Sequence, residues 1–287
     1  MATVGVLGMP IVFRQFEDDG GMYPLDNLYM RGSTDKPRED LEAMLCESHH
    51  KITVTDFGEL GSAFVKAGQI DYQKLGIEAK RIFAASSADT VLVIGGDHSG
   101  AFPFYYLDGQ VVRADAHGDA YMPKDSKSLN WIVSGSNYMF FVEKQGLKTA
   151  NQVWNVGVQP KLLHAAYHNN GFIGRLMTTA ELLNQEVPEP ISFFDVDVDV
   201  LLRDYGLPHR HKTSDLKPED LAGLMAKLNP RVVGLFECVM RYGSIPATIV
   251  SGYPSVFKPI CEAVAELAIA RSLTNQQNHQ ASSVTYH

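Results

Sequence analysis

Short hydrophobic runs that end in Gly or Asp recur along the chain, and each is followed by a more polar, amphipathic stretch. Several runs, such as TVLVIGG and RVVGLFE, are apolar on both faces, as is typical of strands covered by helices on each side. Strands are predicted at 3–9, 51–54, 90–94, 110–114, 152–158, 191–196 and 231–236, and helices at 72–86, 217–228 and 258–273. This alternation predicts an α/β fold, with a mostly parallel, doubly wound sheet in a three-layer αβα domain.

Three segments depart from this alternation. Residues 13–39, rich in Asp, Gly, Pro and Tyr, predict a long irregular excursion, and 202–214 predict a loop after an acidic strand. The polar tail at 274–287 is expected to be disordered. Because no repeat or linker divides the remainder, we expect one domain over residues 1–273.

The composition narrows the class of partner. A net charge of -8 argues against nucleic acid or an anionic membrane surface as the main partner. The three cysteines are far apart and imply no disulfide framework, which fits a reducing cytoplasm. No apolar run approaches the length of a membrane span, and the N-terminus lacks the basic flank of a signal peptide. We therefore expect a cytoplasmic protein whose partner is a small or peptide substrate.

Two strand ends carry residues that bind metals. The run VLVIGG leads into Asp97 and His98; on its own, a single His after such a turn is more often a hydrogen-bonded structural residue than a ligand. The run VVRA leads into Asp115, His117 and Asp119, which the alternation of an extended chain would place on one face. Two carboxylates and an imidazole in one space need a cation, although a solvated loop would also explain this segment taken alone.

A third acidic strand end completes a candidate metal site. Asp195, Asp197 and Asp199 alternate along a strand whose aromatic lead-in favours a central position over an exposed edge. A bridging cation can satisfy such carboxylates, whereas a dry core cannot. Oxygen ligands with a minority of imidazole and no thiolate favour manganese, and the number of ligands exceeds what one ion needs. Two such ions could share a water and lower its pKa.

These segments together resemble the ureohydrolases, the arginase and agmatinase family, whose ordered signature is GGDHS, DAHxD and SFDVDxxD. The chain carries GGDHS at 95–99, DAHGD at 115–119 and SFFDVD at 192–197. The resemblance implies an arginase-like fold and two Mn²⁺ ions per chain that activate a shared water to release urea from a guanidino group. The metal ligands that it implies are His98, Asp115, His117, Asp119, Asp195 and Asp197. It also implies that Asp119 orients the attacking water and that Glu237 pairs with the guanidinium group.

The chain also departs from the family pattern. Where arginases carry a His in an SGNxHG segment, this chain reads SGSNYM at 134–139. Tyr138 is therefore predicted to act in catalysis in place of that His, with Ser136 and Asn137 near the substrate; His209 and His211 are alternatives. The acid and the Asn with which arginases hold a free amino acid are missing from QPK at 159–161 and AYMP at 120–123.

The chain thus retains the residues expected at the guanidine end of the substrate pocket but lacks those that hold a free amino acid at the other end. This combination resembles the peptide arginases, which convert arginine side chains of ribosomally made peptides to ornithine. An arginine-containing peptide is thus the expected substrate. Two alternatives remain open: a hydrolase of a small guanidino compound such as agmatine, guanidinobutyrate or free arginine, and a metal-binding scaffold without turnover. The trimers and hexamers of the family make a homo-oligomer the expected assembly.

Overall fold

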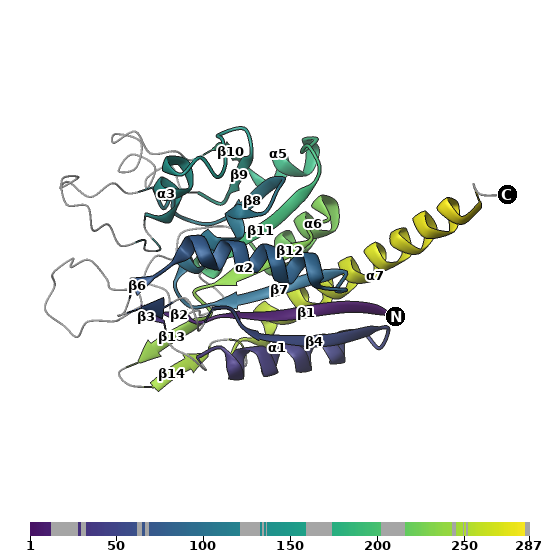
Figure 1. Ribbon diagram of the computed structural model, residues 1–287, viewed down its shortest axis with the longest axis horizontal. Helices are drawn as coiled ribbons and strands as arrows, with labels where there is room; N and C mark the ends of the chain where they lie inside the picture. Colours follow the sequence, from purple (N-terminus) through teal and green to yellow (C-terminus); the bar gives the residue numbers. More distant parts are fainter. Residues whose placement is uncertain are drawn as a thin grey trace, which may run out of the picture.

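The computed structural model describes residues 1–12, 28–29, 33–61, 65–66, 69–120, 133, 135, 137–158, 174–201, 216–242, 245–248, 250 and 252–284. Eight parallel strands form one sheet in the order β10-β9-β8-β11-β12-β7-β1-β4 (Figure 1). Their bounds are β1 Ala2–Met9, β4 Ile52–Glu59, β7 Thr90–Gly95, β8 Gln110–Ala114, β9 Val153–Val156, β10 Arg175–Met177, β11 Ile191–Asp197 and β12 Val232–Phe236. The predicted α/β fold with a parallel sheet is confirmed.

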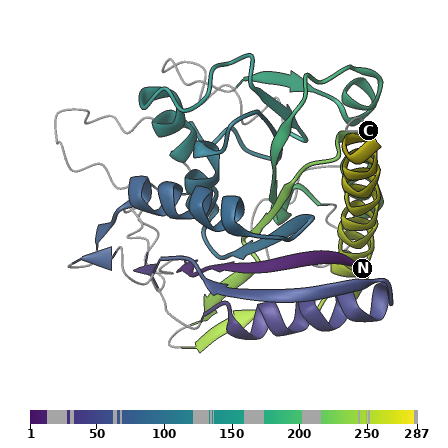
Figure 2. The same ribbon diagram turned by 45° about the vertical axis from the view of Figure 1, so that its right-hand side comes forward.

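Helices cover both faces of this sheet (Figure 2). One face packs against α1 Asp35–Ser48, α5 Thr179–Asn184, α6 Pro218–Leu228 and α7 Pro254–Val284. The other packs against α2 Tyr72–Ala85, α3 Tyr138–Lys144 and the 3₁₀ helix η2 His98–Tyr106. Successive residues of a central strand enter opposite cores: in β7, Leu92 joins the first cluster and Val93 the second. Strands buried on both faces explain the continuous apolar runs of the sequence.

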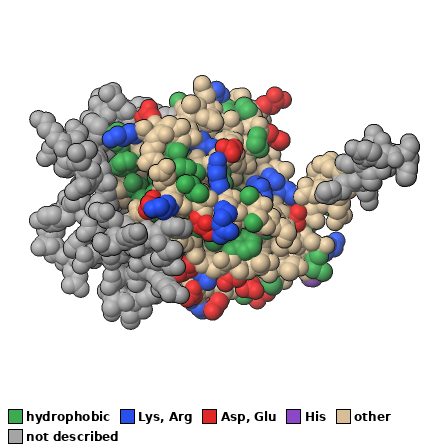
Figure 3. All heavy atoms as spheres, in the orientation of Figure 1, with side chains coloured by type: hydrophobic (Ala, Val, Ile, Leu, Met, Phe, Trp, Pro, Cys, Tyr) green, Lys and Arg blue, Asp and Glu red, His purple; other side chains and the backbone are tan. Residues whose placement is uncertain are grey.

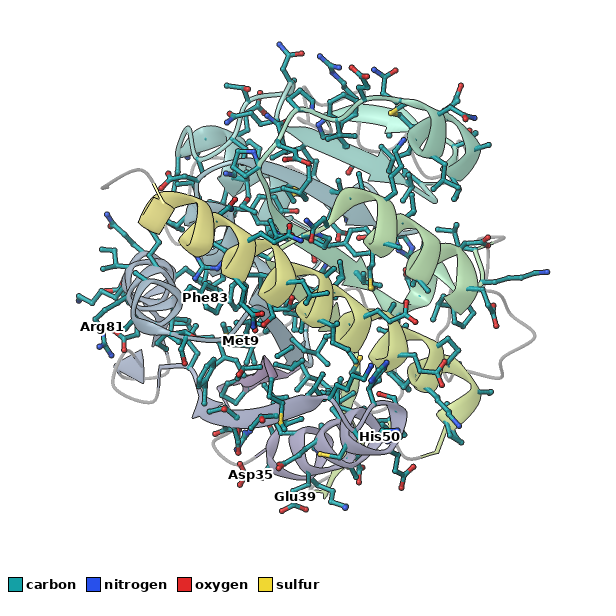
Figure 4. All side chains as sticks on the ribbon, turned by 90° about the vertical axis from the view of Figure 1, so that its right-hand side faces the viewer. Met9, Asp35, Glu39, His50, Arg81 and Phe83 are labelled. Carbon is teal, nitrogen blue, oxygen red and sulfur yellow. The ribbon has the colours of Figure 1, made fainter. Side chains whose placement is uncertain are left out.

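Helix α2 shows how the outer layers are built. Phe83 is buried against the sheet, whereas Arg81 points away from it (Figure 4). The Arg81 side chain forms an ion pair with Glu78 on the same helix, and Lys80 forms one with Asp108. On the face drawn in Figure 3, acidic and basic side chains are interspersed and the hydrophobic ones lie in separate small groups. The described part of this face therefore carries no extended patch of one charge sign.

Three short hairpins lie outside the sheet. They pair β2 Ile11–Val12 with β3 Leu28–Tyr29, β5 Val65–Lys66 with β6 Gln69–Ile70, and β13 Val239–Tyr242 with β14 Ile245–Thr248. A second 3₁₀ turn, η3 Val198–Val200, directly follows β11. Within the described ranges, no helix combines the length and apolarity that crossing a membrane requires.

Two helices and one strand differ from the sequence-based expectation. Strand β4 continues to Glu59, beyond the predicted end at residue 54. Helix α1 begins at Asp35, inside the segment predicted to be irregular, because Leu41 and Leu45 bury one face of it against the sheet. Helix α7 continues to Val284 rather than ending at residue 273, since nothing between those positions is Pro or Gly and the backbone can keep its hydrogen bonds. The expected disorder of 274–284 is therefore wrong for the backbone of α7, whose last turns extend beyond the body of the molecule (Figure 1). The assignment of residues 1–273 to one domain stays a prediction.

Candidate metal centre

The strand order brings the acidic segments to one edge of the sheet. Strands β8, β11, β12 and β7 are consecutive neighbours and all parallel, so their carboxyl ends lie side by side. His98 follows β7, Asp115 follows β8, Asp197 ends β11 and Glu237 follows β12. Backbone hydrogen bonds fix these ends relative to one another: Asp115 N–H donates to Val156 O, and Glu237 N–H donates to Gly96 O. This is the edge at which open α/β sheets bind ligands.

Three carboxylates surround one nitrogen of His98. The Oδ2 atoms of Asp115, Asp119 and Asp197 each lie 3.0 Å from His98 Nδ1. Among the described residues, that nitrogen makes no hydrogen bond, although the side chain is fully buried. One imidazole nitrogen can donate to only one acceptor, and the neighbouring Arg113 donates to the oxygens of Asp115 and Asp119 but not to that of Asp197. A cation bound between the nitrogen and the three oxygens would account for all four atoms together.

A second group forms around His117. His117 Nδ1 lies 2.7 Å from Asp199 Oδ2 and 3.7 Å from Asp115 Oδ1. Asp199 is held by η3, whose first turn is closed by a hydrogen bond from Asp199 N–H to Asp197 Oδ1. Donor atoms of Asp115, His117 and Asp199 lie within 4.8 Å of one another, as do those of Asp197, Asp199 and Glu237. The described residues thus offer two donor sets, one around each histidine, that share Asp115. A third group, of Asp197, Asp199 and Glu237, shares Asp197 with the first set and Asp199 with the second.

The electrostatics of the site require positive charge. Burial, followed by the charge of Asp199, raises the pKa of Glu237 well above its ordinary value, and the same two causes raise the pKa of Asp197. Burial and the charge of Asp115 raise the pKa of Asp119 to about 6. Burial lowers the pKa of His117, but its hydrogen bonds to Asp115 and Asp199 outweigh this and raise it to about 12. Carboxylates in these positions ionise together only when a cation compensates them.

Two residues of the site have strained backbones. Asp119 and Glu237 adopt positive φ angles of 46° and 59°, which lie in the left-handed region that side chains other than Gly rarely occupy. Such strain persists where the surrounding structure holds the residue for a purpose, and it is concentrated at functional sites. Both residues were predicted from the sequence to serve in the reaction.

The structure places Asp195 differently from the prediction. Its carboxylate accepts hydrogen bonds from the hydroxyls of Tyr105 (2.7 Å) and Tyr138 (3.0 Å), and its Oδ1 lies 3.1 Å from His98 Nε2. It therefore contacts the nitrogen of His98 opposite the carboxylate group, and it joins neither donor set. Asp195 and Asp197 share one face of β11 by alternation, and Asp195 lies one residue pair deeper in the sheet, whereas Asp199 follows in η3. Asp197 and Asp199, rather than Asp195, therefore lie in the donor sets.

The contacts of Tyr138 do not favour the predicted catalytic role. The residue is fully buried, and its hydroxyl is engaged by Arg113, His98 and Asp195. Burial raises the pKa of this hydroxyl well above its ordinary value, which makes it a poor proton donor at neutral pH. Tyr138 thus lies beneath the donor sets.

Arg113 is the residue that the sequence analysis missed. It lies in β8, two positions before Asp115, and is fully buried. Its Nη2 donates to Asp119 Oδ2 at 2.6 Å and to Asp115 Oδ2, and its Nε donates to the Tyr138 hydroxyl at 2.8 Å. A lone Arg within an otherwise apolar central strand was the available signal, because a buried guanidinium requires acidic partners.

The remaining predicted residues are only partly placed. Asn137 is buried at the N-terminus of α3, directly before Tyr138. Ser136, His209 and His211 lie outside the described residues, as do positions 121–123 and 159–161. Ala120 is described and fully buried.

The donor types fit two divalent ions that prefer oxygen. One ion would be held by His98, Asp115, Asp119 and Asp197, and a second by His117, Asp115 and Asp199. Hard carboxylate donors with two imidazoles and no thiolate are the ligands expected for Mn²⁺. The buried His98 nitrogen among three carboxylates is the observation that carries this fit.

Comparison with solved structures gives matches over nearly the whole chain. Proclavaminate amidino hydrolase from Streptomyces clavuligerus is 17% identical with a TM-score of 0.60, over 93% of this chain and 92% of that one. Arginase from Bacillus cereus is 14% identical with a TM-score of 0.59, over 93% and 98%. Formiminoglutamase from Trypanosoma cruzi, solved with Mn²⁺, is 13% identical with a TM-score of 0.58, over 93% and 92%. At these identities the likeness establishes the fold.

Sequence comparison establishes the family. No curated protein matches the chain in sequence. A sequence model of the arginase family, however, matches residues 2–173, which is more than half of the chain and includes the GGDHS and DAHGD segments. The match ends before β11, the strand at which the structure and the family spacing place the aspartates differently. The chain therefore belongs to the arginase family.

Proposed function

We propose that the protein is a binuclear manganese hydrolase that cleaves a guanidino group to urea and an amine, acting on arginine side chains of a peptide and leaving ornithine. The observation that carries the chemistry is the set of three carboxylate oxygens around the buried Nδ1 of His98. Membership of the arginase family supports the reaction class. The Mn²⁺ of the formiminoglutamase structure supports the choice of metal.

The two ions, when bound, supply a water whose pKa is lowered toward neutrality. The chain itself supplies binding and orientation. Glu237, at the end of β12 and beside Asp197 and Asp199, accepts hydrogen bonds from the guanidinium group of the substrate. Asp119 is fixed by Arg113 and accepts a hydrogen bond from the attacking water, which turns the lone pair of that water toward the guanidinium carbon. Water adds to that carbon, the bond to the side-chain nitrogen breaks, and urea and the protonated amine leave.

The peptide substrate is inferred from what the pocket lacks. In arginases, an Asn that follows the DAHxD segment contacts the carboxylate of free arginine; this chain has AYMP there, and its Ala120 is buried. The segment that binds the amino group in arginases contains an acid, and here it reads QPK. A peptide needs neither contact, because its α-amino and carboxyl groups are amides.

The test is mass spectrometry of arginine-containing peptides, free arginine, agmatine and guanidinobutyrate after incubation with the Mn²⁺-loaded protein. We expect each converted peptide arginine to lose the mass of urea less that of water. The isosteric variant Asp197→Asn should abolish this loss. Asp108→Asn, at an exposed aspartate paired with Lys80, should leave it unchanged.

The outcomes separate the alternatives. Turnover of the small guanidines alone would retain the hydrolase and reject the peptide substrate. Two bound Mn²⁺ ions without turnover of any guanidine would favour a metal-binding scaffold. A cytoplasmic location and a homo-oligomeric assembly stay predictions, which fractionation and analytical ultracentrifugation would test.

A further inference from the structure

A polar layer lies directly beneath the proposed metal ligands. Asp195 on β11 and Arg113 on β8 are register partners in the sheet, and each lies two positions before a donor, Asp197 and Asp115 respectively. Alternation turns both side chains to the face that packs on η2 and α3. Those elements contribute Tyr105 and Tyr138 to the layer.

Asp195 contacts His98 on the side opposite the donor set. Its Oδ1 lies 3.1 Å from Nε2, while the carboxylates of the donor set surround Nδ1. The two imidazole nitrogens have linked roles: a carboxylate that accepts a hydrogen bond from one fixes the ring and leaves the other free of its proton for a metal. The Asp195 carboxylate is fixed in turn by the Tyr105 and Tyr138 hydroxyls.

Arg113 links this layer to the donors above it. Its Nε donates to the Tyr138 hydroxyl, its Nη1 to His117 O at 2.9 Å, and its Nη2 to Asp119 and Asp115. Arg113 thus pairs directly with the carboxylates of Asp115 and Asp119, and it is linked to Asp195 through the Tyr138 hydroxyl. A guanidinium buried at this depth without acidic partners would cost several kcal/mol.

We propose that Asp195 is a positioning residue that orients His98 for metal binding, and that Arg113 supports it indirectly, through its hydrogen bond to the Tyr138 hydroxyl. The inference rests on the proposed metal-dependent function, because it assigns Asp195 a role toward a bound ion. It also distinguishes this chain from the family spacing, by which Asp195 itself would be a ligand. Loss of an orienting partner lowers metal affinity by about 10–100-fold without removing the site.

The experiment titrates Mn²⁺ into metal-free protein and follows free and bound Mn²⁺ by electron paramagnetic resonance. Wild type should bind two ions per chain. Asp195→Asn, which is isosteric, should still bind two, with the affinity for one of them lowered about 10–100-fold. Asp199→Asn, which removes a proposed donor, should bind only one ion tightly.

A double variant separates orientation from charge balance. Asp195→Asn with Arg113→Gln removes both charges, so the weakened affinity should persist if Asp195 orients His98. Recovery of wild-type affinity in the double variant would overturn the proposal, because only charge balance would then matter. Nitrogen-15 spectra of metal-free protein give a second readout, in which Asp195→Asn should change the tautomer of His98.

Two other results for Asp195→Asn would also overturn the inference. One is an unchanged affinity for Mn²⁺, and the other is a loss of one ion as complete as in Asp199→Asn. If Asp195→Asn does not fold, Tyr138→Phe tests the same connection. Removing the hydroxyl, and with it the contacts to Arg113, His98 and Asp195, should lower affinity by at least about 2-fold, and no change would refute the layer. Failure of wild type to bind two ions would instead reject the proposed function, and the inference with it.

Discussion

Substitutions of Glu237 test the proposed site most directly, because they are expected to lower activity and to raise the stability of the metal-free protein. Its backbone is left-handed, with φ 59°, and its carboxylate lies with those of Asp197 and Asp199. Two substitutions separate these features. Glu237→Gln keeps the shape and removes the charge, and Glu237→Gly removes the side chain and releases the backbone strain.

The effect on activity follows from the lost charge. A hydrogen bond between charged groups contributes about 1.5–3 kcal/mol, so Glu237→Gln should lower kcat/KM for the guanidino substrate roughly 10–150-fold. Because Glu237 contacts the substrate and is not needed to hold two ions, Mn²⁺ stoichiometry should stay at two.

The effect on stability has two parts. Left-handed backbone costs a residue other than Gly about 1–2 kcal/mol, whereas Gly at that position costs about 0.5–1 kcal/mol in additional chain entropy when unfolded. Glu237→Gly should therefore be about 0.5–1 kcal/mol more stable than Glu237→Gln in the metal-free protein. Urea unfolding in the presence of chelator at pH 8 measures this difference.

The second part depends on pH. Burial and the charge of Asp199 raise the pKa of Glu237 above the ordinary 4.5, so the folded protein binds this proton more tightly than the unfolded chain. Stability therefore falls as pH rises above 4.5, and the advantage of Glu237→Gln over wild type should be present at pH 8 and absent at pH 4. Asn229→Gly, at a second left-handed residue (φ 47°), is the backbone control and should gain only a few tenths of a kcal/mol, because Asn tolerates this conformation. A Glu237→Gly variant no more stable than Glu237→Gln would refute the strain argument.

Three further predictions concern packing, titration and metal. Gly157→Ala places a Cβ at a residue with φ 84°, and this Cβ would lie 2.3 Å from Val200 Cγ2 in η3. The substitution should therefore lower the free energy of unfolding by about 2–5 kcal/mol and weaken Mn²⁺ binding. An unchanged stability would show that η3 adjusts freely. Burial lowers the pKa of Lys148 to about 8, and its Nζ donates to Leu107 O and Gly109 O. The unfolded chain binds this proton more tightly than the folded protein. Between pH 8 and 10.5, the free energy of unfolding measured with chelator should therefore rise by about 2 kcal/mol more in wild type than in Lys148→Met. The same pH dependence in both proteins would contradict a buried ammonium group. Mn²⁺ at 100 times its Kd should stabilise wild type by about 2.7 kcal/mol for each ion bound, chelator should reverse this, and unchanged unfolding would count against the site.

The fold class and the edge of the sheet that carries the acidic cluster could be predicted from sequence. Runs apolar on both faces, such as those of β7 and β12, are buried between two helical layers, and their alternation with amphipathic segments predicted the parallel sheet. Donor residues directly after such runs had to meet at one edge, because the carboxyl ends of parallel strands lie together. His98, Asp115, His117 and Asp119 do lie together at this edge, and their role as metal ligands stays a prediction.

Which of Asp195, Asp197 and Asp199 reach the donor sets depends on tertiary contacts. Asp195, Asp197 and Asp199 alternate identically in sequence, and only the register with β8 and the turn at η3 show that the last two reach the edge. Arg113 could not be given a role from sequence, because its partners come from residues 115–119 and from α3. Local sequence determines which face of a strand a side chain occupies, whereas its depth along the strand is set by long-range packing. The orienting role proposed for Asp195 depends on that depth.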